Sequence, residues 1–229
     1  MKTQLHYLFE TVTHCEMCND ATSTHKVLGQ RLNTSQGLSP KKQTGISVSV
    51  MQCTKCNLIY ASPQPIPYDI QQHYGVPPEE YWRSVYFNEE QNVFKKEIDI
   101  VKNKLPFTNG MKALDIGAGL GKVMNALTQH GFDVYGLEPS VPFYERAISL
   151  SKIATDKLKL GMVENVTYPK NTFDFITYGA VFEHLYHPAH SLEKSLEWLK
   201  PNGIVHIEVP SSNHFIAKLV NFYYKLRGT

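Results

Sequence analysis

Four cysteines are the residues of this chain best suited to binding a metal. They form two C-x-x-C pairs, Cys15 with Cys18 and Cys53 with Cys56. The thiolates of one pair can grip a tetrahedral ion from a single tight turn, and two pairs close an all-thiolate site without an open position, as in structural zinc sites. The 34 residues between the pairs are more than the common zinc-ribbon spacing.

The alternatives for these cysteines are free buried thiols or two disulfides. The N-terminal segment lacks the apolar stretch and the cleavage site of a secretory signal, which favours metal-binding thiols over disulfides. An asparagine follows each pair, at Asn19 and Asn57, where a knuckle turn tends to need a left-handed residue. We therefore predict a structural zinc site on the four cysteines.

A second group of residues could bind a nucleotide-like ligand. The segment 115–121 reads D-x-G-x-G-x-G and separates an apolar run from a helical pattern. Its glycines let the backbone approach a ligand, and the helix that follows offers N–H groups. The dinucleotide fingerprint would need a third glycine where Lys122 stands, and Asp115 suits a cation such as a sulfonium better than a pyrophosphate. Glu138, at the end of the next expected strand, can accept hydrogen bonds from ribose hydroxyls.

The segment 111–210 resembles the class I S-adenosylmethionine-dependent methyltransferases. After the glycine turn, residues 173–188 are similar to the fourth-strand motif of that family, and residues 199–210 to its "L-K-P-G-G" turn and fifth strand. With the cysteine pairs, the whole chain is similar to a subset that carries a zinc-binding domain and includes deoxysugar C-methyltransferases.

The resemblance implies S-adenosylmethionine as cofactor and a small-molecule acceptor, a sugar nucleotide carbon or a hydroxyl. Met162 stands where relatives often have an aspartate for the adenine amino group. The residues that the resemblance assigns to the cofactor follow the first four strands of the sheet: Asp115, Gly117, Ala118, Gly119, Gly121, Glu138, Pro139, Met162, Val163, Tyr178 and Gly179.

The pair Glu183-His184 follows the fourth strand and is the candidate catalytic pair. Methyl transfer requires alignment of the acceptor and removal of its proton, and histidine titrates near neutral pH. We predict His184 as general base and Glu183 as its orienter or a substrate ligand. In the alternative, Glu183 caps or packs and His184 is only a polar group in the cleft. His187 and His190 continue the spacing, but Pro188 interrupts the geometry, so we expect solvent-facing histidines rather than a metal site.

The elements that must position these residues alternate between strands and helices, which predicts an α/β fold with a parallel, Rossmann-like sheet. The expected strands are residues 113–116, 134–137, part of 158–163, 173–177 and 204–209; the expected helices are 123–130, 141–152 and 188–199. In the last helix, Leu192, Leu196 and Leu199 share one face.

We expect three regions along the chain. Residues 1–67 form a small zinc-ribbon-like β domain with a loop at 32–44, a strand at 46–50 paired with 58–60, and a proline-rich break at 62–67 that ends it. Residues 68–110 form an aromatic connector with a helix over 88–104. Residues 111–229 form the cofactor-binding domain.

Two features of these regions leave alternatives open. The aromatic residues Tyr74, Tyr81, Trp82 and Tyr86 could form a lid over the ligands, but packing between domains is favoured. Lys41 and Lys42 are expected to be a solvated loop pair rather than a nucleic-acid site.

The C-terminal segment is short for a complete class I sheet. Residues 211–229 fit one amphipathic helix with Phe215, Leu219, Phe222 and Tyr223, which leaves no room for the antiparallel hairpin that completes such a sheet. The fifth strand would then be an uncovered apolar edge, so we expect a truncated chain or one completed by a partner.

Composition narrows the class of protein. Of the 229 residues 42% are hydrophobic, and 23 basic residues against 21 acidic ones give a net charge of +2. These values indicate a folded, cytoplasmic chain without a nucleic-acid or membrane partner. Besides a methyltransferase, the alternatives are an inactive binding module of the same fold and a nicotinamide dehydrogenase, against which Lys122 argues.

Overall fold

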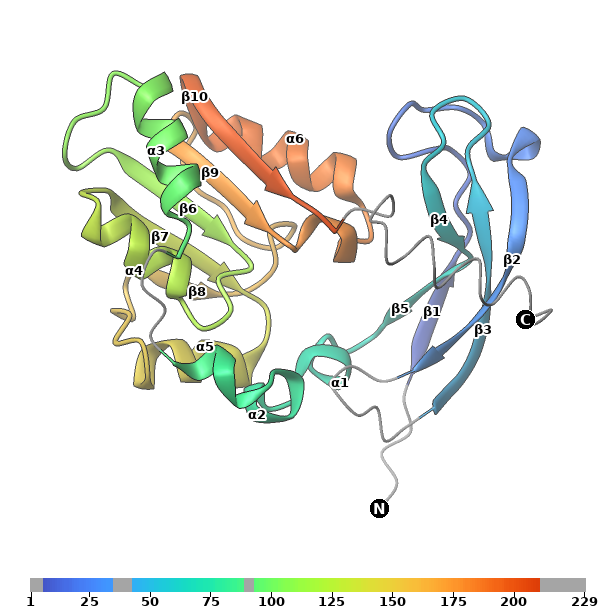
Figure 1. The fold of residues 1–229 in the computed structure, drawn as a ribbon. Coiled ribbons are helices and arrows are strands. Elements are labelled where there is room, and N and C mark those ends of the chain that lie inside the picture. The colour runs from blue at the N-terminus through green and yellow to red at the C-terminus, as the bar shows by residue number, and fades with distance from the viewer. Residues whose placement is uncertain (1–5, 35–42, 89–92, 211–229) are drawn as a thin grey trace.

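The computed structural model describes residues 6–34, 43–88 and 93–210 (Figure 1). A β-rich N-terminal unit lies beside an α/β unit, and the segment with the first two helices joins them. The N-terminal unit has an antiparallel sheet in the order β2 (Lys26–Thr34), β3 (Gln43–Gln52), β4 (Ile59–Ser62) and a two-stranded ribbon of β1 (Tyr7–Glu10) with β5 (Gln64–Pro67). The predicted pairing of 46–50 with 58–60 is confirmed by β3 and β4.

The prediction that residues 62–67 break regular structure is wrong. Gln64–Pro67 forms β5, with Pro65 opposite Phe9 and Pro67 opposite Tyr7. Prolines are tolerated there because a two-stranded ribbon leaves one side of each strand without a ladder to donate to. The expected loop 32–44 is also shorter, since β2 extends to Thr34 and β3 begins at Gln43; Lys41 and Lys42 lie outside the described residues.

Short helical segments form the connector. They are α1 (Gln71–Tyr74), α2 (Pro78–Tyr81), the 3-10 turn Ser84–Phe87 and α3 (Lys95–Lys104). The last helix was expected over 88–104 but begins at Lys95, after Phe94 in a left-handed conformation (φ 56°). It buries Ile98 and Val101 in the core of the α/β unit.

The α/β unit confirms the predicted parallel sheet. Its strand order is β10-β9-β6-β7-β8, and all four pairings are parallel. The strands are β6 (Lys112–Ile116), β7 (Asp133–Glu138), β8 (Leu158–Leu160), β9 (Phe173–Gly179) and β10 (Leu199–Glu208); the helices between them are α4 (Lys122–Gln129), α5 (Val141–Ser149) and α6 (Pro188–Trp198).

Successive residues of the central strands point to opposite faces of the sheet. Ala113 of β6 packs on one face with core residues of α3 and α4, whereas Leu114 packs on the other face with Trp198 of α6. These two apolar clusters hold the carboxyl ends of β6, β7 and β9 side by side.

Helix α6 buries a different face from the one predicted. Leu196 is 47% exposed, while Ser191, Ser195 and Trp198 are buried. The small serines let the helix approach the sheet closely, and Trp198 fills the space at its end. Of the three leucines, Leu196 is exposed, whereas Leu199, the first residue of β10, packs against the core. The amphipathic helix expected after Pro210 lies outside the described residues. In the described part of the chain, no helix is long and apolar enough to cross a membrane.

Candidate functional site

A cavity of about 500 Å³ lies at the carboxyl ends of the parallel strands. This is the edge of an open α/β sheet where ligands bind, and the volume is that of an ordinary small-molecule site. Seven of the predicted cofactor residues lie on its wall: Gly117, Gly119, Glu138, Pro139, Met162, Val163 and Gly179.

The glycine turn brings the backbone to the cavity surface. Gly117 and Gly119 both have left-handed φ values, 73° and 54°. A Cβ on Gly117 would fall 2.3 Å from Val181 Cγ2, and a Cβ on Gly119 would fall 3.2 Å from the Trp82 ring. The backbone N–H of Gly117 donates to Leu137 O (2.8 Å), which ties the turn to the end of β7. Side chains at these two positions would strain the turn and reduce the space above it.

Glu138 ends β7 on the cavity wall and is 6% exposed. Its Oε2 accepts a hydrogen bond from Gly119 N at 2.7 Å, and its Oε1 accepts one from Ser140 N at 2.8 Å. Burial raises the pKa of Glu138 to about 7, although these two amides lower it. The carboxylate is therefore fixed at the edge of the glycine turn, with lone pairs left for other donors.

Asp115 lies behind this wall rather than on it. Burial, and to a lesser extent the nearby Glu138 carboxylate, raise the pKa of Asp115 to about 8. Its place on β6, close to a second buried carboxyl group, puts negative charge beneath the turn when both groups are ionised.

Three other predicted cofactor residues also lie off the cavity wall. Gly121 is the N-cap of α4 (φ 75°), and a Cβ there would fall 2.7 Å from Ile153 Cγ1, so its role is close helix packing. Ala118 is buried, with its N–H bonded to Leu137 O. Tyr178 is fully buried, and its hydroxyl donates to Ser191 O at 3.2 Å, because side chains of β9 alternate between the two faces of the sheet and Tyr178 points to the face that α6 covers.

The predicted catalytic pair lies in the turn after β9, the 3-10 segment Phe182–His184. His184 lines the cavity, and Glu183 Oε1 lies 3.9 Å from His184 Nε2 without lining it. His187 was expected to face solvent but lines the cavity as well, whereas His190 is exposed.

The aromatic connector forms the opposite wall. Tyr74, Tyr81 and Trp82 line the cavity, so they are part of the site and not only packing between domains. Trp82 stacks on Tyr86 with ring centroids 5.7 Å apart and meets Phe143 of α5 edge-on at 4.9 Å.

Hydrogen bonds anchor α1 to the loop after β7. Gln71 Nε2 donates to Pro139 O at 2.7 Å, and Val141 N donates to Gln71 Oε1 at 3.0 Å. Ser140 Oγ donates to Tyr74 O at 2.7 Å. These contacts hold Tyr74 over the residues that follow Glu138.

The sequence did not identify several wall residues, because they belong to no motif and come from β5, the connector, α5 and the loops after β7, β8 and β9. They are Ile66, Ile70, Ser140, Phe143, Glu164, Leu185 and Tyr186. The one feature of the sequence that could have indicated them is their position near the carboxyl ends of strands or in the connector.

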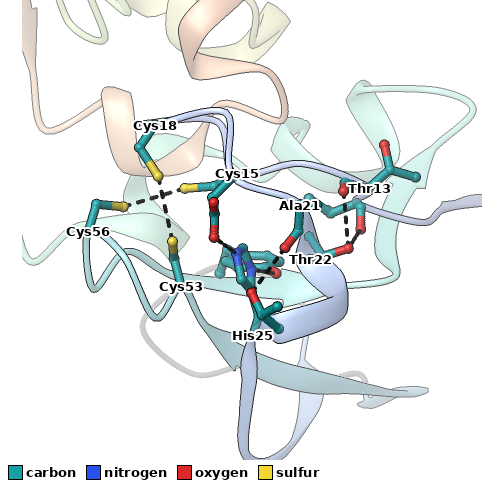
Figure 2. A network of polar contacts seen from close by, with 12 residues as sticks. Thr13, Cys15, Cys18, Ala21, Thr22, His25, Cys53 and Cys56 are labelled. Carbon is teal, nitrogen blue, oxygen red and sulfur yellow. Dashed lines mark hydrogen bonds and ion pairs between the residues drawn. The ribbon is translucent and has the colours of Figure 1, made fainter.

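The four cysteines meet between two turns of the N-terminal unit (Figure 2). All four sulfur atoms lie within 4.8 Å of one another; Cys15 Sγ is 3.5 Å from Cys56 Sγ, and Cys18 Sγ is 3.6 Å from Cys53 Sγ. A tetrahedral zinc with bonds of ~2.3 Å holds its sulfurs about 3.8 Å apart, so the cluster fits the ion. All four are free thiols in the described structure.

The turns of the cysteine cluster have the predicted backbone. Asn19 and Asn57 are left-handed (φ 58° and 66°), and their N–H groups donate to Cys15 O and Cys53 O at 2.8 and 3.0 Å. Next to the cluster, the buried His25 has Nδ1 2.5 Å from Tyr60 Oη and Nε2 3.7 Å from Asp20 Oδ2. No sequence pattern indicates His25, since it is a lone histidine outside both cysteine pairs.

A family model described as a methyltransferase domain matches residues 89–227 of this chain. The chain belongs to the class I S-adenosylmethionine-dependent methyltransferase family. The parallel sheet that contains β6, β7 and β9 is thus the sheet of a methyltransferase domain.

Curated relatives of the chain include ubiquinone biosynthesis O-methyltransferases. The protein of that name from Bradyrhizobium diazoefficiens is 30% identical over 126 residues, which are 52% of this chain and 48% of the relative. The mitochondrial one from Schizosaccharomyces pombe is 32% identical over 100 residues, 42% of this chain and 36% of the relative. The chain spans about half the length, or less, of these curated relatives.

Solved methyltransferases with a similar fold overlap half of the chain. A putative methyltransferase in complex with the Trm112 methyltransferase activator of Haloferax volcanii is 24% identical, with a TM-score of 0.43 over 49% of this chain and 50% of that one. A possible histamine N-methyltransferase from Thermotoga maritima is 22% identical, with a TM-score of 0.44 over 57% of each chain.

Proposed function

We propose that this chain binds S-adenosylmethionine in the cavity and transfers its methyl group to a small molecule. The observation that carries the proposal is the Glu138 carboxylate, buried at the end of β7 and bonded to Gly119 N at the rim of the glycine turn. When bound, the cofactor supplies an electrophilic methyl group on its sulfonium. The residues of the chain bind and orient it.

Polar and apolar residues of the cavity wall would contact different parts of the cofactor. Glu138 has lone pairs left to accept from both ribose hydroxyls, and the backbone of Gly117 and Gly119 borders the ribose and methionine portions. Pro139, Met162 and Val163 offer apolar contacts to the adenine. A cationic sulfonium would favour the ionised form of Asp115 and lower its raised pKa, so cofactor binding and ionisation of Asp115 are expected to reinforce each other.

His184 is the proposed general base. It lines the cavity on the turn after β9, and Glu183, 3.9 Å away, can orient its imidazole. A base in this position takes the proton of the acceptor as the methyl group is transferred.

The acceptor is proposed to be a small molecule methylated on a hydroxyl oxygen, with a sugar nucleotide carbon as the second choice. Among the described wall residues none is lysine or arginine, so they offer no countercharge to a diphosphate. The ubiquinone biosynthesis O-methyltransferases among the relatives support transfer to oxygen.

The cysteine cluster is proposed to hold a structural zinc ion on Cys15, Cys18, Cys53 and Cys56. The spacing of the sulfurs and the left-handed turns support an all-thiolate site without an open position, which stabilises the fold and takes no part in the chemistry.

The test of this function is binding of S-adenosylhomocysteine to the full chain, measured by calorimetry. We expect one site per chain with a dissociation constant in the micromolar range. A folded chain that shows no heat of binding would exclude the cofactor, and with it the proposal.

A further inference from the structure

Both ring nitrogens of His187 face carboxylates of the N-terminal unit. Glu10 Oε2, at the end of β1, lies 3.6 Å from Nε2, and Glu16 Oε1 lies 3.8 Å from Nδ1. Glu16 stands between the two cysteines of the first pair, Cys15 and Cys18. Because His187 lines the cavity, a residue of the metal-binding turn touches a residue of the cavity wall.

Glu16 also contacts the start of α6. Its Oε2 accepts a hydrogen bond from Ala189 N at 3.3 Å. His187 is the N-cap of this helix but makes no side-chain cap hydrogen bond, and the first turn of the helix contains no acidic residue. Carboxylates stabilise helix N-termini because the first N–H groups lack partners and the helix dipole is positive there. Glu16 therefore supplies, from a distant segment, the cap that the sequence of α6 lacks.

We propose that Glu16 is a positioning residue that couples occupancy of the cysteine site to the acceptor side of the cavity. The turn that carries His184 is fixed at its start, where Ala180 N donates to Glu208 O at 2.9 Å. At its end it is fixed by the contacts of Glu16 with His187 and Ala189. A metal ion that fixes Cys15 and Cys18 also fixes the Glu16 between them, so the bound ion orders this end of the turn.

This inference rests on the proposed zinc site and the proposed role of His184, and its effect is local. His187 is 38% and Glu16 28% exposed at the side chain, and ion pairs at such positions contribute little to global stability. Loss of Glu16 should therefore increase opening of the first turn of α6 while the core remains folded.

Hydrogen exchange of residues 182–192, followed by mass spectrometry in the full zinc-loaded chain, tests the coupling. We expect Glu16→Ala to speed exchange in the first turn of α6 about fivefold, the effect of one lost cap. Chelation of the wild-type chain should produce the same increase. Glu16→Gln, which keeps an oxygen acceptor for Ala189 N, should restore most of the protection.

The matched control is Thr54→Ala. Thr54 occupies in the second pair the position that Glu16 has in the first, and it is exposed. We expect this variant to exchange like the wild type.

Two results for Glu16→Ala would overturn the proposal. Wild-type exchange in zinc-loaded Glu16→Ala would overturn the proposal, and so would loss of zinc from this variant, because Glu16 would then act on the metal site and not on α6. Zinc content and S-adenosylhomocysteine binding are measured on the same samples. A wild-type chain without either would count against the proposed function, while the comparison of Glu16→Ala with Thr54→Ala would still test the helix contact.

Discussion

At the scale of single residues, Glu138 is the group on which the proposed cofactor binding depends. Glu138→Ala removes the acceptor of two backbone N–H groups and, in the proposed complex, of the ribose hydroxyls. We expect S-adenosylhomocysteine to bind at least about thirtyfold more weakly, which corresponds to about 2 kcal/mol. Calorimetry checks this, with Glu145→Ala on the exposed side of α5 as the control. Equal affinity in both variants would remove Glu138 from the site.

The pKa of Asp115, which burial raises to about 8, leads us to predict how the free energy of unfolding depends on pH. An unfolded aspartate titrates near pH ~4, so between these values the folded chain keeps a proton that the unfolded chain has lost. This group therefore lowers the free energy of unfolding as the pH rises from about 4 to 8. Asp115→Asn should gain at least about 1 kcal/mol relative to wild type between pH 5 and pH 8 while losing cofactor affinity.

Urea unfolding of the ligand-free chain at the two pH values measures that difference. The same gap between wild type and Asp115→Asn at pH 5 and pH 8 would show that the carboxyl is not the source of the pH dependence.

His184 is tested by turnover once an acceptor is found. His184→Gln should lower kcat by about 10²–10⁴ and leave S-adenosylhomocysteine affinity within twofold. The exposed His190 gives the matched control, His190→Gln. Full activity in His184→Gln would assign the base to another residue.

At the scale of elements, the connector reports on the cavity through Trp82. Trp82 lies against Gly119, whereas the second tryptophan, Trp198, is buried against the sheet in α6. We expect S-adenosylhomocysteine to change the tryptophan fluorescence. The change should disappear in Trp82→Phe and persist in Trp198→Phe; the reverse pattern would place the ligand elsewhere.

The sequence predicted the elements whose pattern is local. The strand-turn-helix around Gly117, the acid at the end of β7 and the left-handed Asn19 and Asn57 are all determined by a few neighbouring residues. Two predictions failed where a distant partner decides. Pro65 and Pro67 lie in a strand because β1 pairs with it, and α6 turns its serines to the sheet because Trp198 fills the remaining space.

Residues of the connector and the histidines could not be placed from sequence for the same reason. His187 faces the cavity because Glu10 and Glu16 hold it from the N-terminal unit. Spacing within the chain carries no information about such a contact. The cavity wall could thus be predicted on its glycine side and not on its aromatic side.

At the scale of the whole molecule, removal of the metal should affect the N-terminal unit and leave ligand binding by the α/β unit intact. Mercurial titration of the thiols should release one zinc ion per chain, and Cys18→Ser should bind less. We expect the metal-free chain to keep S-adenosylhomocysteine binding, since Gly119 and Glu138 belong to the α/β unit. A simultaneous loss of this binding would show that the cysteine cluster supports the cofactor wall itself.

The ribbon of β1 and β5 leads from the unit that carries the four cysteines directly to the cavity, since Ile66 of β5 is a wall residue. Ile66, Ile70, Tyr74 and Trp82 all precede the methyltransferase sheet in the chain, yet they face its ligand edge. Residues of one cavity wall are therefore encoded on two separate stretches of the gene. A chimaera that exchanges only the stretch before residue 88 should alter the part of the wall that Ile66 and Ile70 form, while it keeps Gly119 and Glu138 of the methyltransferase sheet.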